Sequence, residues 1–248
     1  MTKMMRGVCG VLAISSGFLL ASCSSTDASG ALEKLKSSGL LKTASGALST
    51  DEIVLGLKEA LSKGSETVVG QLGQSDGFNG DPSIRIPLPK TLAKARDFAA
   101  KVGLEGSFDE LEVKLNRAAE LATPKAKSLF LGAIKDMSVE DAKGILRGPD
   151  NAATEFFEKK TRTQLAGEMR PLVEGSLSQV GAVKYFNQLV SRYQKIPLAP
   201  KIDADLTGHV VNKGMDGIFA YVAKEEKAIR SDPVKRTTEL LRKVFASK

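Results

Sequence analysis

Apolar residues recur at every third or fourth position along most of the chain, which is the period of an α-helix with one buried face. The clearest stripe comprises Ile53, Leu57, Leu61, Gly64, Val68 and Leu72. Ser49 and Glu52 stand just before it with the spacing of a capping box, in which each side chain binds the backbone amide of the other residue. This pattern predicts a helix that starts directly after Ser49.

Further helix-start signals divide the rest of the chain. They are Ser107 with Glu110, Pro124, Ser138 with Asp141, Asp150, Asp203, and Asp232 before Pro233. Pro171 is expected either to open a helix or to kink one. No stretch of similar length alternates with period two. We therefore predict an all-α fold, a single multi-helix bundle of about seven to ten helices.

Two proline-rich segments, residues 75–89 and 195–200, interrupt the helical pattern. The first contains Pro82, Pro87 and Pro89, which exclude a continuous helix. The second is a partial echo of the first. We expect both to be extended connections that pack over the bundle, with a short strand pair between them as one outcome.

The first 22 residues have the pattern of a bacterial lipoprotein signal peptide. Lys3 and Arg6 precede an uncharged run over residues 7–20, which as a helix would cover only about 20 Å of the roughly 30 Å bilayer core. The run ends in Leu20-Ala21-Ser22-Cys23, which resembles the lipobox. We predict cleavage before Cys23 and its modification by diacylglycerol and palmitate. An ordinary secretory signal peptide is the alternative.

Processing would leave a lipidated N-terminus and tether over residues 23–48 and a helical domain over residues 49–248. Residues 24–30 are small and polar, as in a flexible linker, and residues 31–42 have a short amphipathic pattern. Ser24 and Ser25 follow Cys23 with no aspartate directly after it. This resembles the sorting pattern of lipoproteins in the outer membrane, so the predicted location is the outer membrane, facing the periplasm.

Composition narrows the chemistry of the processed chain. Cys9 would leave with the signal peptide and Cys23 would be alkylated, which excludes disulfides, thiolate nucleophiles and cysteine zinc sites. Without Lys3 and Arg6 the chain has 34 basic and 29 acidic residues, a net charge of +5. This charge is small and interleaved, and aromatic residues are few, so we do not expect nucleic acid as a partner. The lipid would supply the membrane affinity.

The order of several short motifs resembles a bacterial family catalogued as domain of unknown function 4197. The motifs are Ile84-Arg85-Ile86-Pro87-Leu88-Pro89, Asn116-Arg117-Ala118-Ala119-Glu120, Met137 to Asp141 with Ile145-Leu146, Asp150 to Thr154, Asp216-Gly217-Ile218-Phe219, Glu225-Glu226, Ile229-Arg230, Pro233 and Arg236-Thr237-Thr238-Glu239-Leu240-Leu241. The resemblance covers roughly residues 48 to 246. It implies an exported helical protein, and it implies no cofactor or catalytic residue.

The sequence contains few of the residue patterns that form known catalytic or metal sites. His209 is the only histidine, so a multi-histidine metal site is excluded, and we predict no metal, cofactor or catalytic residue. Six polar residues on helical segments form candidate networks; they are Asn116, Arg117, Glu120, Glu226, Arg230 and Arg236. One interpretation is a structural network that fixes how helices meet. The other is a carboxylate pair, Glu120 and Glu226, for acid–base catalysis.

Three functional hypotheses follow. The first is a membrane-anchored exported lipoprotein whose noncatalytic helical domain is an envelope interaction or structural module, with an envelope protein as partner. The second is a carrier or sensor for an apolar or lipid ligand, which requires a continuous apolar cavity. The third is a carboxylate-dependent hydrolase, which requires two facing carboxylates in an open cleft.

Overall fold

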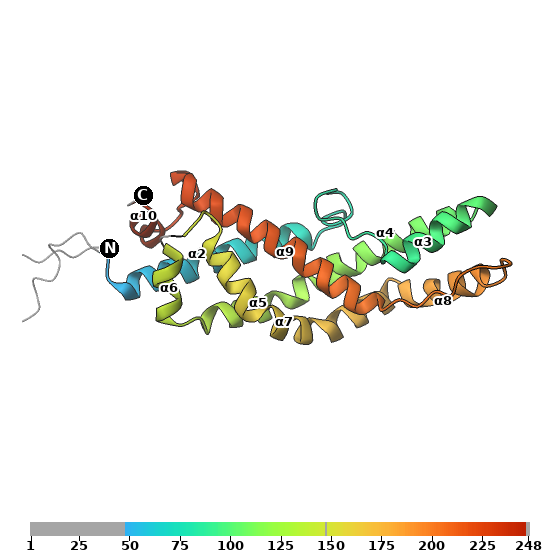
Figure 1. Cartoon of the computed structure of the whole chain (residues 1–248). Helices are drawn as coiled ribbons and strands as arrows, with labels where there is room; N and C mark the ends of the chain where they lie inside the picture. The colour runs from blue at the N-terminus through green and yellow to red at the C-terminus, as the bar shows by residue number, and fades with distance from the viewer. Residues whose placement is uncertain (1–47, 147, 247–248) are drawn as a thin grey trace, which may run out of the picture. The chain divides into compact units, whose positions relative to one another are not determined.

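A computed structural model describes residues 48–146 and 148–246, and these residues form α-helices joined by loops and short 3₁₀ turns, without a β-strand (Figure 1). The α-helices are α2 (Thr50–Leu72), α3 (Lys90–Ala99), α4 (Glu105–Ala122), α5 (Lys127–Lys135), α6 (Val139–Leu146), α7 (Ala152–Gln179), α8 (Ala182–Tyr193), α9 (Leu206–Ser231) and α10 (Glu239–Phe245). The all-α prediction is confirmed. The predicted signal peptide, Cys23 and most of the tether lie outside the described residues.

Several predicted helix starts are confirmed by their hydrogen bonds. The Ser49 hydroxyl accepts from the Glu52 amide at 3.2 Å, and the Ser49 amide donates to the Glu52 carboxylate at 2.9 Å. Pro124 opens a 3₁₀ turn that leads into α5. The Asp232 carboxylate accepts from the Val234 amide at 2.9 Å and caps the 3₁₀ turn Pro233–Lys235.

Three predicted caps are wrong by one to three residues. The helix predicted from Ser107 begins earlier, at Glu105, because Gly103 adopts a left-handed φ of 72° and turns the chain directly into α4. The N-cap of α7 is Asn151, not Asp150, and the N-cap of α9 is Asp205, not Asp203. Helix α7 continues through Pro171, so this proline does not open a helix.

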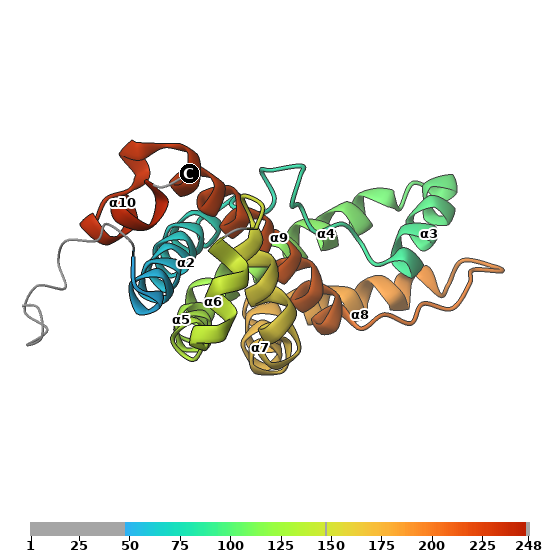
Figure 2. The same cartoon turned by 60° about the vertical axis from the view of Figure 1, so that its left-hand side comes forward.

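The longer helices pack around α9, which contacts α2, α4 and α7 (Figures 1 and 2). Three aromatic rings, one from each helix, contact one another where α5, α7 and α9 meet. Phe130 lies 5.8 Å from Phe219, Phe157 lies 5.9 Å from Phe219, and all three side chains are buried. Such aromatic contacts add to the free energy gained from burying apolar area.

A second packing centre joins α3, α4 and α8. The buried Tyr193 ring contacts Phe98 and Phe108 edge-on, at 6.2 and 5.9 Å between ring centroids. Helix α3 also touches the segment after α8, because the Thr91 hydroxyl donates to the Asp203 carbonyl at 3.1 Å. These contacts place α3 beside the connection between α8 and α9.

The proline-rich segment between α2 and α3 packs on α4 and α9 as an irregular chain. Phe78 and Ile86 are fully buried, and Gly217 on α9 makes room for this segment, since a Cβ at residue 217 would lie 2.8 Å from the Phe78 ring. The described residues show no pairing of strands between 75–89 and 195–200, so that expectation is wrong. Pro87 and Pro89 have no N–H to donate to a strand partner, and α4 side chains bind the segment instead.

Candidate functional site

Three of the six predicted polar residues lie on α4, where they hold the segment 76–88. Glu120 is 4 % exposed, and its Oε1 accepts from the consecutive amides of Phe78 and Asn79, both at 3.1 Å. Its Oε2 accepts from the Arg117 guanidinium at 2.7 Å, and Arg117 also reaches Asp76 at 2.8 Å. Arg117 therefore links the helix to the start of the segment.

Asn116, one turn earlier on α4, pairs with the backbone of Ile86. Its Oδ1 accepts from the Ile86 amide and its Nδ2 donates to the Ile86 carbonyl, each at 2.9 Å. Glu112 continues the row: it accepts from the Leu88 amide at 3.2 Å and pairs with Arg85 at 3.0 Å. Residues four apart share a helix face, so Glu112, Asn116 and Glu120 form one polar row against the segment. We call Glu112, Asn116, Arg117 and Glu120 the α4 cluster.

The other three predicted residues lie at the C-terminal end of α9 and just after it. Glu226 is 2 % exposed and accepts from the amides of Ala153 and Thr154, at 3.0 and 2.8 Å, and from the Thr154 hydroxyl at 2.7 Å. These amides belong to the first turn of α7, whose own N-cap, Asn151, makes no side-chain cap. Glu226 thus caps α7 from another helix, where a carboxylate is favoured by the helix dipole.

Two arginines complete this second group. Arg230 pairs with Glu226 at 2.7 Å, and its guanidinium stacks 5.4 Å from the Phe245 ring. Arg236 donates to the carbonyls of Ile229 and Arg230, at 3.1 and 2.8 Å, and so satisfies the C-terminal end of α9. We call Thr154, Glu226, Arg230 and Arg236 the α9 cluster.

The structure therefore separates the six candidates into two groups. Glu120 and Glu226 bind different backbone segments and share no hydrogen-bond partner in the described part of the chain. Each carboxylate already accepts at least three hydrogen bonds or ion-pair contacts from protein groups. His209, the only histidine, is half-buried, and its Nε2 lies 2.7 Å from the Pro87 carbonyl, which fixes it as a donor to the same segment.

Sequence reasoning missed two members of these clusters. Glu112 has the same spacing of four from Asn116 that links Asn116 to Glu120, so the row on α4 was visible in the sequence. Thr154 gives no such signal, because its partner Glu226 is 72 positions away.

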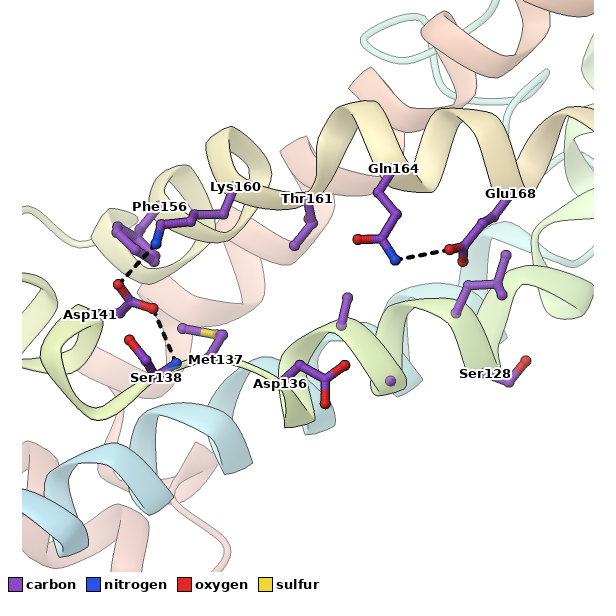
Figure 3. A pocket seen from close by; sticks show the side chains of 13 residues that line it. Ser128, Asp136, Met137, Ser138, Asp141, Phe156, Lys160, Thr161, Gln164 and Glu168 are labelled. Atoms are coloured by element: carbon purple, nitrogen blue, oxygen red, sulfur yellow. Dashed lines mark hydrogen bonds and ion pairs between the residues drawn. The ribbon is translucent and has the colours of Figure 1, made fainter.

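A surface groove of about 460 Å³ lies between α5, the start of α6 and α7 (Figure 3). Leu129, Ala133 and Met137 line one side and Phe156 lies opposite, all partly buried. The polar lining includes Ser128, Asp136, Asp141, Lys160, Gln164 and Glu168. The groove is therefore lined by both apolar and polar side chains.

The polar groups at the two ends of the groove are held in place by one another. At one end Lys160 lies 3.3 Å from Asp141 and 5.2 Å from the centroid of the Phe156 ring. At the other end Gln164 donates to Glu168 at 2.9 Å. Hydrogen bonds from the Ser138 side chain and amide, together with Lys160, keep the pKa of Asp141 below its ordinary value, so this edge stays charged near neutral pH.

Gly132 lies in the middle of the α5 side of the groove. A Cβ added to it would meet no atom within 4 Å. Packing therefore does not require glycine here, although glycine in a helix costs about 1 kcal/mol relative to alanine. The sequence indicated Ser138 and Asp141 only as a helix start. It did not reveal the groove, because the groove depends on how α5 and α7 pack against each other.

No group of three or more His, Cys, Asp or Glu side chains is placed to hold a metal ion in residues 48–146 and 148–246. The helices described for the same ranges are all too short or too polar to cross a membrane.

A family model described as "Protein of unknown function (DUF4197)" matches residues 47–246. Comparisons with curated proteins and with solved structures find no match.

Proposed function

Since the chain belongs to the DUF4197 family, whose description assigns no activity, we propose its function from the site: a lipid-anchored envelope protein with a noncatalytic helical domain that binds a partner protein. The observation that carries the noncatalytic part is the use of the two buried carboxylates. Glu120 and Glu226 each accept two consecutive backbone amides and an arginine, so both carboxylates serve to hold backbone segments in place.

The anchor part of the proposal rests on the sequence around Cys23. Lipidation there would attach the helical domain to the outer membrane, facing the periplasm, through a tether that ends before Thr50. Cys23→Ala should abolish incorporation of labelled palmitate and move the protein from the membrane fraction to the soluble fraction. Undiminished labelling of the variant would refute the anchor.

The groove between α5 and α7 supports the binding part of the proposal. Protein interfaces combine apolar and polar side chains, and this groove is lined by both kinds. Gly132 also lines the groove, and no atom lies within 4 Å of a Cβ added to it, so a larger side chain at this position would project into the groove.

Photo-crosslinking in the native envelope tests the groove. A photoreactive residue in place of Gln164, on the rim, should give a discrete adduct with an envelope protein. The same residue in place of Lys159, an exposed neighbour that does not line the groove, should give none. Equal crosslinking from both positions would contradict a specific site.

A matched pair of glycine variants sharpens this test. Gly132→Leu should fill the groove and suppress the adduct from position 164. Gly167→Leu, also at a helical glycine with no atom within 4 Å of an added Cβ, should leave it unchanged. Both substitutions improve helix propensity, so loss of the adduct in the first alone cannot come from unfolding.

The two alternative functions have less support. A carrier for an apolar ligand needs a continuous apolar cavity, whereas the interior between the helices holds large buried side chains such as Phe130, Phe157 and Tyr193. A hydrolase needs two carboxylates across an open cleft, whereas Glu120 and Glu226 are each buried against a different backbone segment.

A further inference from the structure

One end of the helical unit presents apolar side chains to solvent among unpaired positive charges. The turn between α3 and α4 and the connection after α8 both lie at this end (Figures 1 and 2). Val102 in the first is 54 % exposed, and Leu198 in the second is 96 % exposed. The Phe98–Tyr193 contact joins the two segments just behind these positions. We call Lys101, Val102, Arg192, Lys195, Leu198 and Lys201 the distal tip.

Leu198 occupies a backbone conformation that its side chain disfavours. The Ala199 amide donates to the Ile196 carbonyl at 3.2 Å, which closes a turn with Pro197 second and Leu198 third. Leu198 has a φ of 63°, the left-handed value that a type II turn requires at this position and that favours glycine or asparagine. The chain thus holds a leucine in a strained conformation and points it into solvent, with almost no contact inside the protein to offset the strain.

The charges around these residues are mostly uncompensated. Lys101, Arg192, Lys195 and Lys201 form no ion pair within the described ranges, and Lys101 lies 5.4 Å from the Phe98 ring. The nearby acids Asp97 and Asp109 both face Arg96, and Glu110 binds Lys114 and Tyr185. Glu105 and Asp203 are acids near this end that form no ion pair with a described cation. The local field is therefore positive.

We propose that the distal tip binds the surface of an anionic phospholipid bilayer. Exposed aliphatic side chains would enter the boundary between headgroups and acyl chains, and the lysines and arginine would contact lipid phosphates. Helix α2 begins at the opposite end of the described helices, so this contact is separate from the N-terminal side of the domain (Figures 1 and 2). The inference goes beyond the lipid anchor and does not depend on it.

Vesicle co-sedimentation tests the tip without the anchor. The protein is the chain from residue 23 with Cys23→Ser, which keeps the whole described core, between Leu48 and Phe245. It should bind vesicles of equal parts phosphatidylglycerol and phosphatidylcholine and lose this binding at high salt. Vesicles of phosphatidylcholine alone should bind at least about tenfold more weakly, because each basic residue contributes roughly 1 kcal/mol near an anionic surface.

Substitutions separate the apolar and charged parts of the tip. Leu198→Asn should weaken binding about tenfold, because it removes one aliphatic side chain from the lipid boundary. Asparagine tolerates positive φ, so thermal stability should stay equal or rise. Lys195→Gln combined with Lys201→Gln should weaken binding about thirtyfold.

Matched controls lie away from the tip. Leu55→Asn removes an aliphatic side chain that is 57 % exposed on α2, and Lys63→Gln with Lys159→Gln removes two exposed lysines. Both controls should bind as the parent does. Equal binding to neutral vesicles, no loss in the tip variants, or equal losses in the controls would each overturn the proposal. Palmitate labelling at Cys23 is measured separately, so failure of the anchor and failure of the tip are distinguishable.

Discussion

The α4 cluster and the α9 cluster use the same groups in different surroundings. In each, a buried glutamate accepts from two consecutive backbone amides and pairs with an arginine on its own helix. Arg117, the partner in the α4 cluster, has a side chain that is 32 % exposed, whereas the Arg230 side chain in the α9 cluster is 1 % exposed. Water can therefore solvate the first arginine but not the second.

This difference in burial determines how much stability the protein loses when each cluster is disrupted. A buried ion pair contributes little net stability while intact, because desolvation offsets its attraction, but removing one partner leaves an uncompensated charge in the interior. The α9 cluster also caps α7, a helix of 28 residues, whereas the α4 cluster holds an irregular segment. We therefore expect damage to the α9 cluster to affect the whole fold and damage to the α4 cluster to stay local.

The largest expected effect is that of Glu226→Gln. It leaves Arg230 charged and buried and weakens the cap of α7, so it should lower the free energy of unfolding by about 3–5 kcal/mol in urea titrations. Glu225→Gln is the matched control, because Glu225 is the adjacent residue and lies 3.9 Å from Lys235 on a more exposed face. The control should change stability by less than about 0.5 kcal/mol. A similar small effect of Glu226→Gln would mean that the cluster does not hold the fold.

Glu120→Gln should have a smaller and more local effect. Arg117 keeps Asp76 and water as partners, so the loss of unfolding free energy should be about 1–3 kcal/mol. Hydrogen exchange should accelerate at the Phe78 and Asn79 amides and stay unchanged at Ala153 and Thr154. Equal acceleration at both sites would show that the two clusters unfold together, which would contradict a local role for the α4 cluster.

The sequence predicted the parts of both clusters that lie within one helix. Asn116 with Glu120 and Glu226 with Arg230 are four apart, and this spacing places side chains on one face whatever the tertiary fold. The all-α class and the capping box at Ser49 depended on similar local rules. These predictions needed no knowledge of which helices meet.

The partners that these side chains bind outside their own helix depend on long-range contacts, which the spacing of residues along the sequence does not reveal. Glu226 meets Ala153 and Thr154 only because α7 and α9 pack side by side. The misplaced caps have a different cause. Asp203 and Asp205 are the same residue type and have equal intrinsic ability to cap a helix. Asp205 is the cap in the structure, where it accepts from the Gly208 amide at 2.8 Å and from Arg170 at 3.0 Å.

Thr154→Val isolates a single hydrogen bond of the α9 cluster. Valine keeps the shape of threonine and removes only the hydroxyl that donates to Glu226 at 2.7 Å. Because the Thr154 amide still donates to the same oxygen at 2.8 Å, the unfolding free energy should fall by only about 1 kcal/mol. Calorimetry of Thr154→Val and of Glu226→Gln compares the unfolding free energy that each variant loses. An equal loss in both would mean that the Thr154 hydroxyl supplies most of the cap of α7.

The smallest expected effect is the response of the 76–88 segment to acid. The Tyr221 hydroxyl donates to the Asp81 carboxylate, and this bond, followed by that of the Ser83 amide, lowers the pKa of Asp81 from 3.8 to about 2. A carboxyl whose pKa is lowered by folding stabilises the fold above its ordinary pKa. That contribution decreases as the pH falls below about 4 and is lost once the pH passes through about 2.

Tyr221→Phe tests which bond sets this pKa. Without the hydroxyl the pKa of Asp81 should rise toward 3.8, while the Ser83 amide keeps part of the shift. A carboxyl titration followed by NMR measures the midpoint directly. Because neither residue belongs to the α9 cluster, the amides of Ala153 and Thr154 should be unaffected by the substitution at neutral pH. An unchanged Asp81 midpoint would assign the low pKa to the turn backbone, and α9 would then hold this segment through packing against Gly217 rather than through Tyr221.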